Sequence, residues 1–122
     1  MRTKTKAWVF GFMAGGAAYL YLWLNPVISN PILWPGLCGL AGFLAFLMSD
    51  TSMAITLMAV ITGAFSLNVI HIVTDVAADP TSHNLFPFEL AFTLLLTGAG
   101  AVIGVALARL ARYWIARRRI EN

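Results

Sequence analysis

Between Lys6 and Arg109 the chain contains no lysine or arginine, and from Ala7 to Ser49 it contains no charged residue at all. A soluble domain carries about 25% charged residues. Here only 11% of the 122 residues are charged and 60% are hydrophobic, which leaves too little charge to cover a water-exposed surface. Apolar runs of about 18 residues or more are typical of membrane-spanning helices. The sequence therefore predicts an all-α, polytopic integral membrane protein.

Prolines, turn residues and charges divide the chain into four apolar segments. The expected spans are residues 7–24, 32–48, 52–74 and 87–110. Proline lacks an amide donor and disfavours helix in the residue before it, so Asn25-Pro26 and Asp79-Pro80 are expected to end helices. We expect one domain, a transmembrane four-helix bundle. An ordered loop at 75–86 and a basic tail at 109–122 complete it.

The basic residues set the expected orientation. Arg2, Lys4 and Lys6 precede the first span, and five arginines close or follow the fourth. The positive-inside rule then places both termini in the cytoplasm of a cell that carries this protein in its inner membrane. We expect anionic lipid headgroups to bind the terminal arginines, at about 1 kcal/mol each. These are Arg109, Arg112, Arg117, Arg118 and Arg119. A nucleic-acid partner is not expected, because the tail is short and no nucleic-acid-binding fold is indicated.

Small residues recur at intervals of three and four along three of the spans. The glycines expected to pack helices together are Gly11, Gly15, Gly36, Gly39, Gly42, Gly100 and Gly104. In lipid, helices associate through van der Waals contact, and glycine lets two backbones approach closely. Packing within one chain is the favoured interpretation, and homo-oligomerisation through one such face is the alternative.

Both histidines and three of the five acidic residues lie in one stretch, VIHIVTDVAADPTSHNLFPFE, residues 69–89. Asn68 lies just before this stretch, and His71, Asp75 and Asp79 follow it at intervals of three, four and four residues. On a helix this spacing places all four side chains on one face, which we call the polar stripe. His71 and Asp75 are placed to hydrogen-bond. Glu89 follows Pro87 at the expected start of the last helix, where an acid favours the helix dipole.

Three interpretations of this polar stripe remain open. In the structural one, Asn68 bonds a neighbouring helix, His71 pairs with Asp75, and Asp79 helps to end the helix. In the second, His71, Asp75 and His83 are candidate metal ligands, although no HExxH or paired CxxC spacing supports them and no cofactor is predicted. In the third, the stripe is an ion or proton site, because ionisable groups at membrane depth usually face a bundle interior or a water-filled cavity.

The segment DPTSHNLFPFE, residues 79–89, resembles a segment of small uncharacterised bacterial integral membrane proteins. The resemblance covers this segment alone and implies no activity. It favours a bacterial inner-membrane location.

No nucleophile, base and orienting group occur together, so an enzyme is not expected. The first span also lacks the acidic residue on which small multidrug exporters depend. We expect a structural or accessory membrane protein whose external loop and polar stripe form a contact surface for a larger membrane complex. The alternatives are a small oligomeric ion- or proton-coupled transporter using Asn68, His71 and Asp75, and a holin-like pore former.

Overall fold

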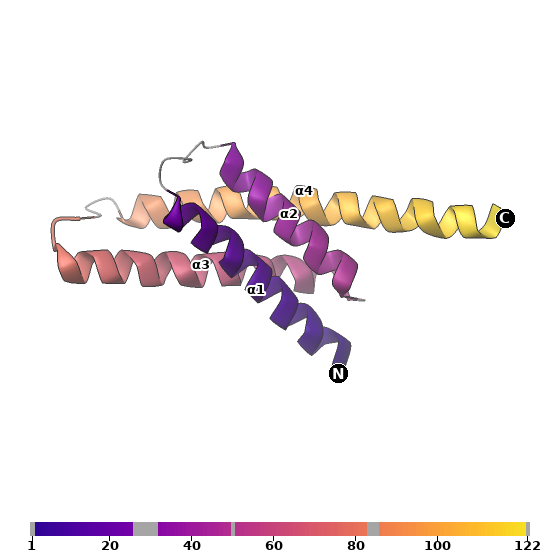
Figure 1. The fold of residues 1–122 in the computed structure, drawn as a ribbon, viewed down its shortest axis with the longest axis horizontal. Coiled ribbons are helices and arrows are strands. Elements are labelled where there is room, and N and C mark those ends of the chain that lie inside the picture. The colour runs from indigo at the N-terminus through magenta and orange to yellow at the C-terminus, as the bar shows by residue number, and fades with distance from the viewer. Residues whose placement is uncertain (1, 26–31, 50, 83–85, 122) are drawn as a thin grey trace.

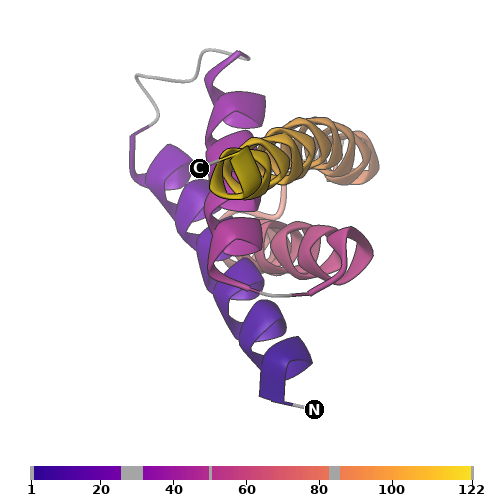
Figure 2. The same cartoon turned by 90° about the vertical axis from the view of Figure 1, so that its right-hand side faces the viewer.

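The chain folds into four helices. The computed structural model describes residues 2–25, 32–49, 51–82 and 86–121. The helices are α1 (Arg2–Leu24), α2 (Leu33–Met48), α3 (Met53–Ala78) and α4 (Phe86–Glu121) (Figure 1). The expected all-α four-helix bundle is confirmed. Figures 1 and 2 show two layers, in which α1 and α2 cross diagonally over the antiparallel pair α3 and α4. The most extensive contacts join α2 to α4 and α1 to α3.

Three of the helices, α1, α3 and α4, are long and apolar enough to cross a membrane. Helix α2 is apolar but has only 16 residues. At a rise of about 1.5 Å per residue it measures about 24 Å, less than the roughly 30 Å of a bilayer's hydrocarbon core. The start of α1 and the end of α4 lie toward the same end of the bundle in Figure 1, which we call the terminal end. The opposite end, where α3 leads to α4, is called the loop end.

Helix α3 extends beyond residue 74, the end of the expected span, and stops at Ala78, where Asp79-Pro80 was expected to end it. Neither glycine nor proline interrupts the chain between Gly63 and Pro80. Ser52 caps its start by accepting a hydrogen bond from the Ile55 amide at 3.4 Å. Asp79 ends it in an extended conformation.

Helix α4 continues through the expected basic tail to Glu121. Neither glycine nor proline follows Gly104, and arginine and alanine are good helix formers, so nothing in the sequence stops it near residue 110. In Figure 1 its last turns extend beyond the other three helices. The basic residues therefore stand on the last turns of a helix.

The bundle interior is built from small side chains. One cluster of buried residues consists of Ala18, Cys38, Ala41, Ala45, Val60 and Ala101. Large apolar side chains point outward instead: Met13 and Leu95 are each 66% exposed and Ile103 is 59% exposed. An exposed apolar surface of this extent is unfavourable in water and ordinary against lipid tails.

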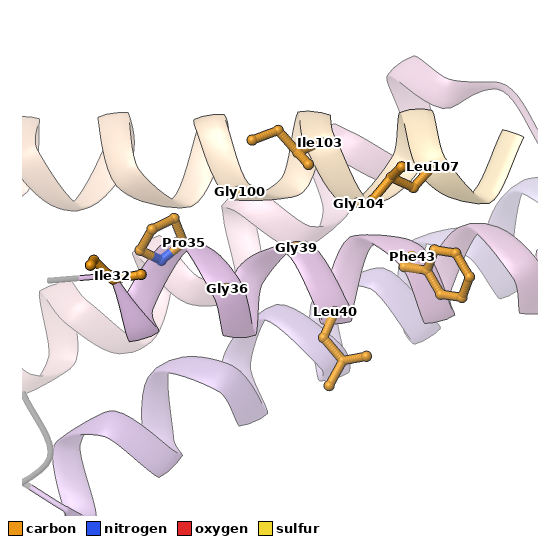
Figure 3. Close-up of a pocket in the computed structure, with 10 residues that line it drawn as sticks. All are labelled: Ile32, Pro35, Gly36, Gly39, Leu40, Phe43, Gly100, Ile103, Gly104 and Leu107. Carbon is orange, nitrogen blue, oxygen red and sulfur yellow. The ribbon is translucent and has the colours of Figure 1, made fainter. Parts of the chain in front are cut away.

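Glycines allow the two main helix pairs to touch backbone to backbone. Between α2 and α4, Gly39 lies beside Gly100 and Gly104 (Figure 3), and a Cβ on Gly104 would overlap the Gly39 carbonyl group. A Cβ on Gly42 would lie 2.9 Å from the Ala101 carbonyl oxygen, closer than real Cβ contacts come. These contacts position α2 against α4 with no side chain between them.

The pair α1 and α3 meets in the same way. A Cβ on Gly15 would overlap Val60, and a Cβ on Gly11 would lie 2.6 Å from the Ala59 Cβ. Gly63 of α3, which the sequence analysis did not select, would overlap Phe12 if it carried a Cβ. We call these close contacts in both helix pairs the glycine seam. Gly36, one of the glycines expected to pack helices together, lies outside this seam, since nothing described lies within 4 Å of its Cβ position.

Candidate functional site

The polar side chains of the loop-end half meet inside the bundle. Asn68 of α3 is 4% exposed and lies between α1 and α4. The Tyr19 hydroxyl of α1 donates to Asn68 Oδ1 at 2.7 Å, and Asn68 Nδ2 donates to Thr93 Oγ1 of α4 at 2.9 Å. Buried polar groups in lipid require partners of this kind. One asparagine therefore ties three helices together.

His71 extends this set toward the loop end. Its Nδ1 lies 2.8 Å from the Tyr19 hydroxyl oxygen, and its Nε2 lies 3.0 Å from Asp75 Oδ2. The imidazole stacks on the Trp23 indole with ring centroids 4.4 Å apart. Side-chain exposure rises from 22% at His71 to 41% at Asp75. Tyr19, Asn68, His71, Asp75 and Thr93 thus form one hydrogen-bonded chain that runs inward from a half-exposed carboxylate, and we call it the polar network.

A second polar contact lies one helical turn further toward the terminal end. The Trp34 indole N–H of α2 donates to Thr97 Oγ1 of α4 at 3.2 Å. The Trp34 ring also meets the Tyr19 ring edge to face, with centroids 5.5 Å apart. This contact connects α2 to the polar network through van der Waals packing. Cys38 is fully buried beside these helices.

The other residues of the predicted site are Asp79, Glu89 and His83. Asp79 and Glu89 are exposed, and His83 lies outside the residues that the structure describes. The Asp79 carboxylate accepts hydrogen bonds from the Thr81 hydroxyl at 2.7 Å and the Thr81 amide at 2.9 Å. These bonds hold the pKa of Asp79 below its usual value. Asp79 thereby organises the turn that follows α3.

The arrangement gives no support to a metal centre among the described residues. No group of three or more His, Cys, Asp and Glu side chains in that part of the chain is placed to hold a metal ion. Both ring nitrogens of His71 already face Tyr19 and Asp75, so a metal would have to displace one of these partners. The metal hypothesis for His71, Asp75 and His83 remains a sequence-based prediction.

The arginines predicted to bind lipid headgroups divide into two groups. Arg112 turns toward α2, and its Nη2 donates to the carbonyl oxygens of Phe46 at 2.7 Å, Leu47 at 2.9 Å and Ser49 at 3.2 Å. Its guanidinium carbon lies 4.8 Å from the centroid of the Phe46 ring. Arg112 therefore satisfies the last carbonyls of α2 and complements its helix dipole.

The other four arginines are exposed along α4. Arg109 reaches the Met53 sulfur at 3.3 Å, and the Arg117 guanidinium lies 6.0 Å from the Trp114 ring. Arg118 and Arg119 occupy the last turns. Their exposure leaves this part of α4 accessible to an anionic surface.

An apolar depression runs along the contact between α2 and α4. It has a volume of about 490 Å³, and Figure 3 shows that Pro35, Phe43, Ile103 and Leu107 line it together with the seam glycines. Its lining presents almost no polar atom. It is therefore unsuited to a hydrophilic substrate.

Sequence reasoning identified Asn68, His71 and Asp75 but missed their partners on other helices. Tyr19, Thr93 and Thr97 were not selected as site residues. A signal for the threonines exists: two hydroxyl residues four apart in an apolar helix mark one polar face. Comparisons with protein-family models, curated proteins and solved structures gave no match for this chain.

Proposed function

We propose that the protein is a multi-pass protein of a bacterial inner membrane with both termini in the cytoplasm. The charge gap between Lys6 and Arg109 supports this orientation through the positive-inside rule. The arrangement of α1 and α4, whose terminal ends lie at the same end of the bundle, agrees with it. The loop end is then external. Exposed Trp114 and Arg117 to Arg119 are suited to bind anionic headgroups on the cytoplasmic side.

Its role in this proposal is structural or accessory, with the external end as a contact surface for a larger membrane protein. The single observation that carries the proposal is that the buried side chains of the polar network satisfy one another within the chain. Toward the terminal end the glycine seam closes the helices on each other. The groups left facing outward at the loop end are acidic and aromatic, among them Asp79, Phe88 and Glu89.

Site-specific photo-crosslinking in native membranes tests this proposal. A photoreactive residue at Phe88, which is 73% exposed, should give one discrete protein adduct. The same residue at Ile103, which faces outward beside the α2–α4 contact, is the matched control and should give lipid adducts. If Phe88 and Ile103 give the same lipid adducts and no protein adduct, the external end has no protein partner and the proposal fails.

A proton- or ion-coupled transporter is the second candidate. The observation that favours it is the continuous line of hydrogen bonds from half-exposed Asp75 to buried Thr93. Flux across liposomes that is lost in Asp75→Asn and kept in Asp79→Asn would support transport. A holin-like pore former is the third candidate. Host lysis on induction, unaffected by His71→Ala, would support it.

A further inference from the structure

The hydrogens of the polar network can be counted from its heavy atoms. Tyr19 has a single hydroxyl hydrogen, which it donates to Asn68 Oδ1. The contact of 2.8 Å with His71 Nδ1 then needs a hydrogen on that nitrogen. His71 Nε2 faces the Asp75 carboxylate, which when ionised only accepts. With both ring nitrogens donating, this arrangement describes a protonated His71 beside an ionised Asp75.

The same heavy-atom positions accommodate a neutral His71 if the hydrogen bonds from Nδ1 to Thr93 reverse their direction. Nε2 keeps its hydrogen for Asp75, and Nδ1 becomes an acceptor for the Tyr19 hydroxyl. Tyr19 must then accept from Asn68, which requires the Asn68 amide to turn so that its nitrogen and oxygen exchange places. Thr93 can donate to the amide oxygen, because a hydroxyl group is both donor and acceptor. No backbone movement is needed.

An intermediate arrangement is unfavourable. If His71 lost the Nδ1 hydrogen while Tyr19 still donated to Asn68, two lone pairs would face each other at 2.8 Å. An unmade hydrogen bond in such a buried place costs roughly 1–3 kcal/mol. Proton loss at His71 therefore favours reversal at Asn68, although the two residues are connected only through Tyr19.

We infer that His71 is a proton-binding site whose occupancy is transmitted through Tyr19 to the orientation of the Asn68 amide. Uptake forms one N–H bond, at Nδ1, with a proton from water at the half-exposed edge of the ring. Tyr19 keeps its own hydrogen, which turns from His71 to Asn68, and the Asn68 amide turns to donate to Thr93. This inference goes beyond the structural role proposed above and does not depend on any partner protein.

The groups facing His71 come from α1 and α3. Tyr19 and the Trp23 ring face it from α1, and Asp75 pairs with it from α3. On α4, the first turn carries the acidic residue Glu89. From α2, Trp34 meets Tyr19 with its uncharged ring. Asp75 holds Nε2 as a donor in both states.

Nitrogen NMR on the full chain in lipid nanodiscs tests the inference. His83→Gln leaves His71 as the single histidine. Labelling of histidine and asparagine with ¹⁵N then reports on the His71 ring and on the Asn68 amide. As the pH rises, the Nδ1 signal should move to the position of an unprotonated nitrogen while Nε2 remains protonated. The Asn68 side-chain amide signals, identified by their loss in Asn68→Ala, should shift with the same midpoint.

Two variants show whether Tyr19 carries the transmission. In Tyr19→Phe the His71 signals should still change with pH, and those of Asn68 should stay constant. Tyr21→Phe, an exposed neighbour on the same helix, is the matched control and should leave both changes in place. Thr93→Val, which removes the donor required for the reversed state, should also hold the Asn68 signals constant.

The inference is overturned by any of three results in this experiment. The first is a His71 ring that keeps one protonation state as the pH changes. The second is an Asn68 amide that stays unchanged while His71 titrates in the otherwise native chain. The third is an Asn68 shift that persists in both Tyr19→Phe and Thr93→Val. None of these depends on the crosslinking result, so this inference and the proposed accessory role fail separately.

Discussion

The two halves of the bundle hold their helices together in different ways. In the terminal half, the glycine seam brings backbones into direct contact, as at Gly39 and Gly104. In the loop-end half, side chains hydrogen-bond across helices, as at Tyr19, Asn68 and Thr93. Lipid tails are as apolar as leucine, so burial of large apolar groups does not drive helix association in a membrane. Close packing and interhelical hydrogen bonds are the two forces that remain, and the two halves of this bundle use them to different degrees.

The glycine seam and the polar network also differ in how many arrangements they allow. A backbone contact in the glycine seam has one geometry, and any added atom displaces a helix. The polar network has two hydrogen-bond arrangements on one set of heavy atoms. We therefore expect substitutions in the glycine seam to act on stability, and substitutions in the polar network to act on stability moderately and on protonation directly.

The largest effect is expected for Gly104→Leu. Its side chain would have to occupy the position of the Gly39 carbonyl group, so α2 and α4 must separate. The expected loss of unfolding free energy is about 3 kcal/mol or more, the upper end for overpacking. It is measured by unfolding in mixed detergent micelles.

Gly36→Leu is the matched control for this change. It inserts the same side chain into α2, where nothing among the described residues lies within 4 Å of the Cβ position. Its stability should stay near that of the unmodified protein. Equal losses in the two variants would show that the seam contacts do not determine stability.

Gly100→Leu addresses the choice between packing within one chain and homo-oligomerisation. A Cβ on Gly100 would overlap Pro35 of the same chain. We therefore expect this variant to lose stability by an amount similar to Gly104→Leu. A stable, folded variant that changes only its oligomeric state in sedimentation measurements would instead favour a contact between copies.

A smaller effect is expected in the polar network. Asn68→Leu removes a hydrogen-bond partner of the Tyr19 hydroxyl and of the Thr93 hydroxyl. The free energy of unfolding should fall by about 1–2 kcal/mol, because interhelical hydrogen bonds in membranes contribute about 0.6 kcal/mol each on average. A double-mutant cycle with Thr93→Val isolates the bond between the two residues. Strictly additive losses would mean that this bond contributes nothing to stability.

Arg112→Gln should lower the free energy of unfolding by about 1 kcal/mol. Hydrogen bonds to a charged group contribute about 1.5–3 kcal/mol, and the half-exposed position of Arg112 reduces this value through solvent screening. Its loss would leave the last carbonyls of α2 without these donors. Arg119→Gln, an equal change of charge on the same helix, should leave unfolding unchanged. A similar loss in both variants would assign the effect to net charge rather than to the end of α2.

The smallest effect concerns the turn after α3. Because the Thr81 hydroxyl and amide hold the pKa of Asp79 below its usual value, this carboxylate stabilises the fold above its unfolded-state pKa. That contribution is lost as the pH falls through the lower, folded-state pKa. Thr81→Val removes the hydroxyl donor and should raise the pKa of Asp79 toward its ordinary value. Carbon NMR of the Asp79 carboxyl group measures this; an unchanged titration would show that the amide bond alone is responsible.

The sequence by itself determined the class of protein and the order of its helices. Charge, hydropathy and proline positions are local properties, so the charge gap and the breaks at Asn25-Pro26 and Asp79-Pro80 could be read along the chain. The longer α4 was also readable, because no helix breaker follows Gly104. The spacing of His71 and Asp75 predicted their contact for the same reason: both lie on one helix, four residues apart.

Only the tertiary structure decided which residues meet across helices. Tyr19 and Asn68 are 49 positions apart, and their contact depends on how α1 and α3 are rotated about their own axes and crossed. The same rotation selects Gly63 for the glycine seam and leaves Gly36 outside it. It also turns Arg112 toward the end of α2. Helix periodicity defines faces but not their partners, since in lipid no single apolar stripe marks the side that must be buried.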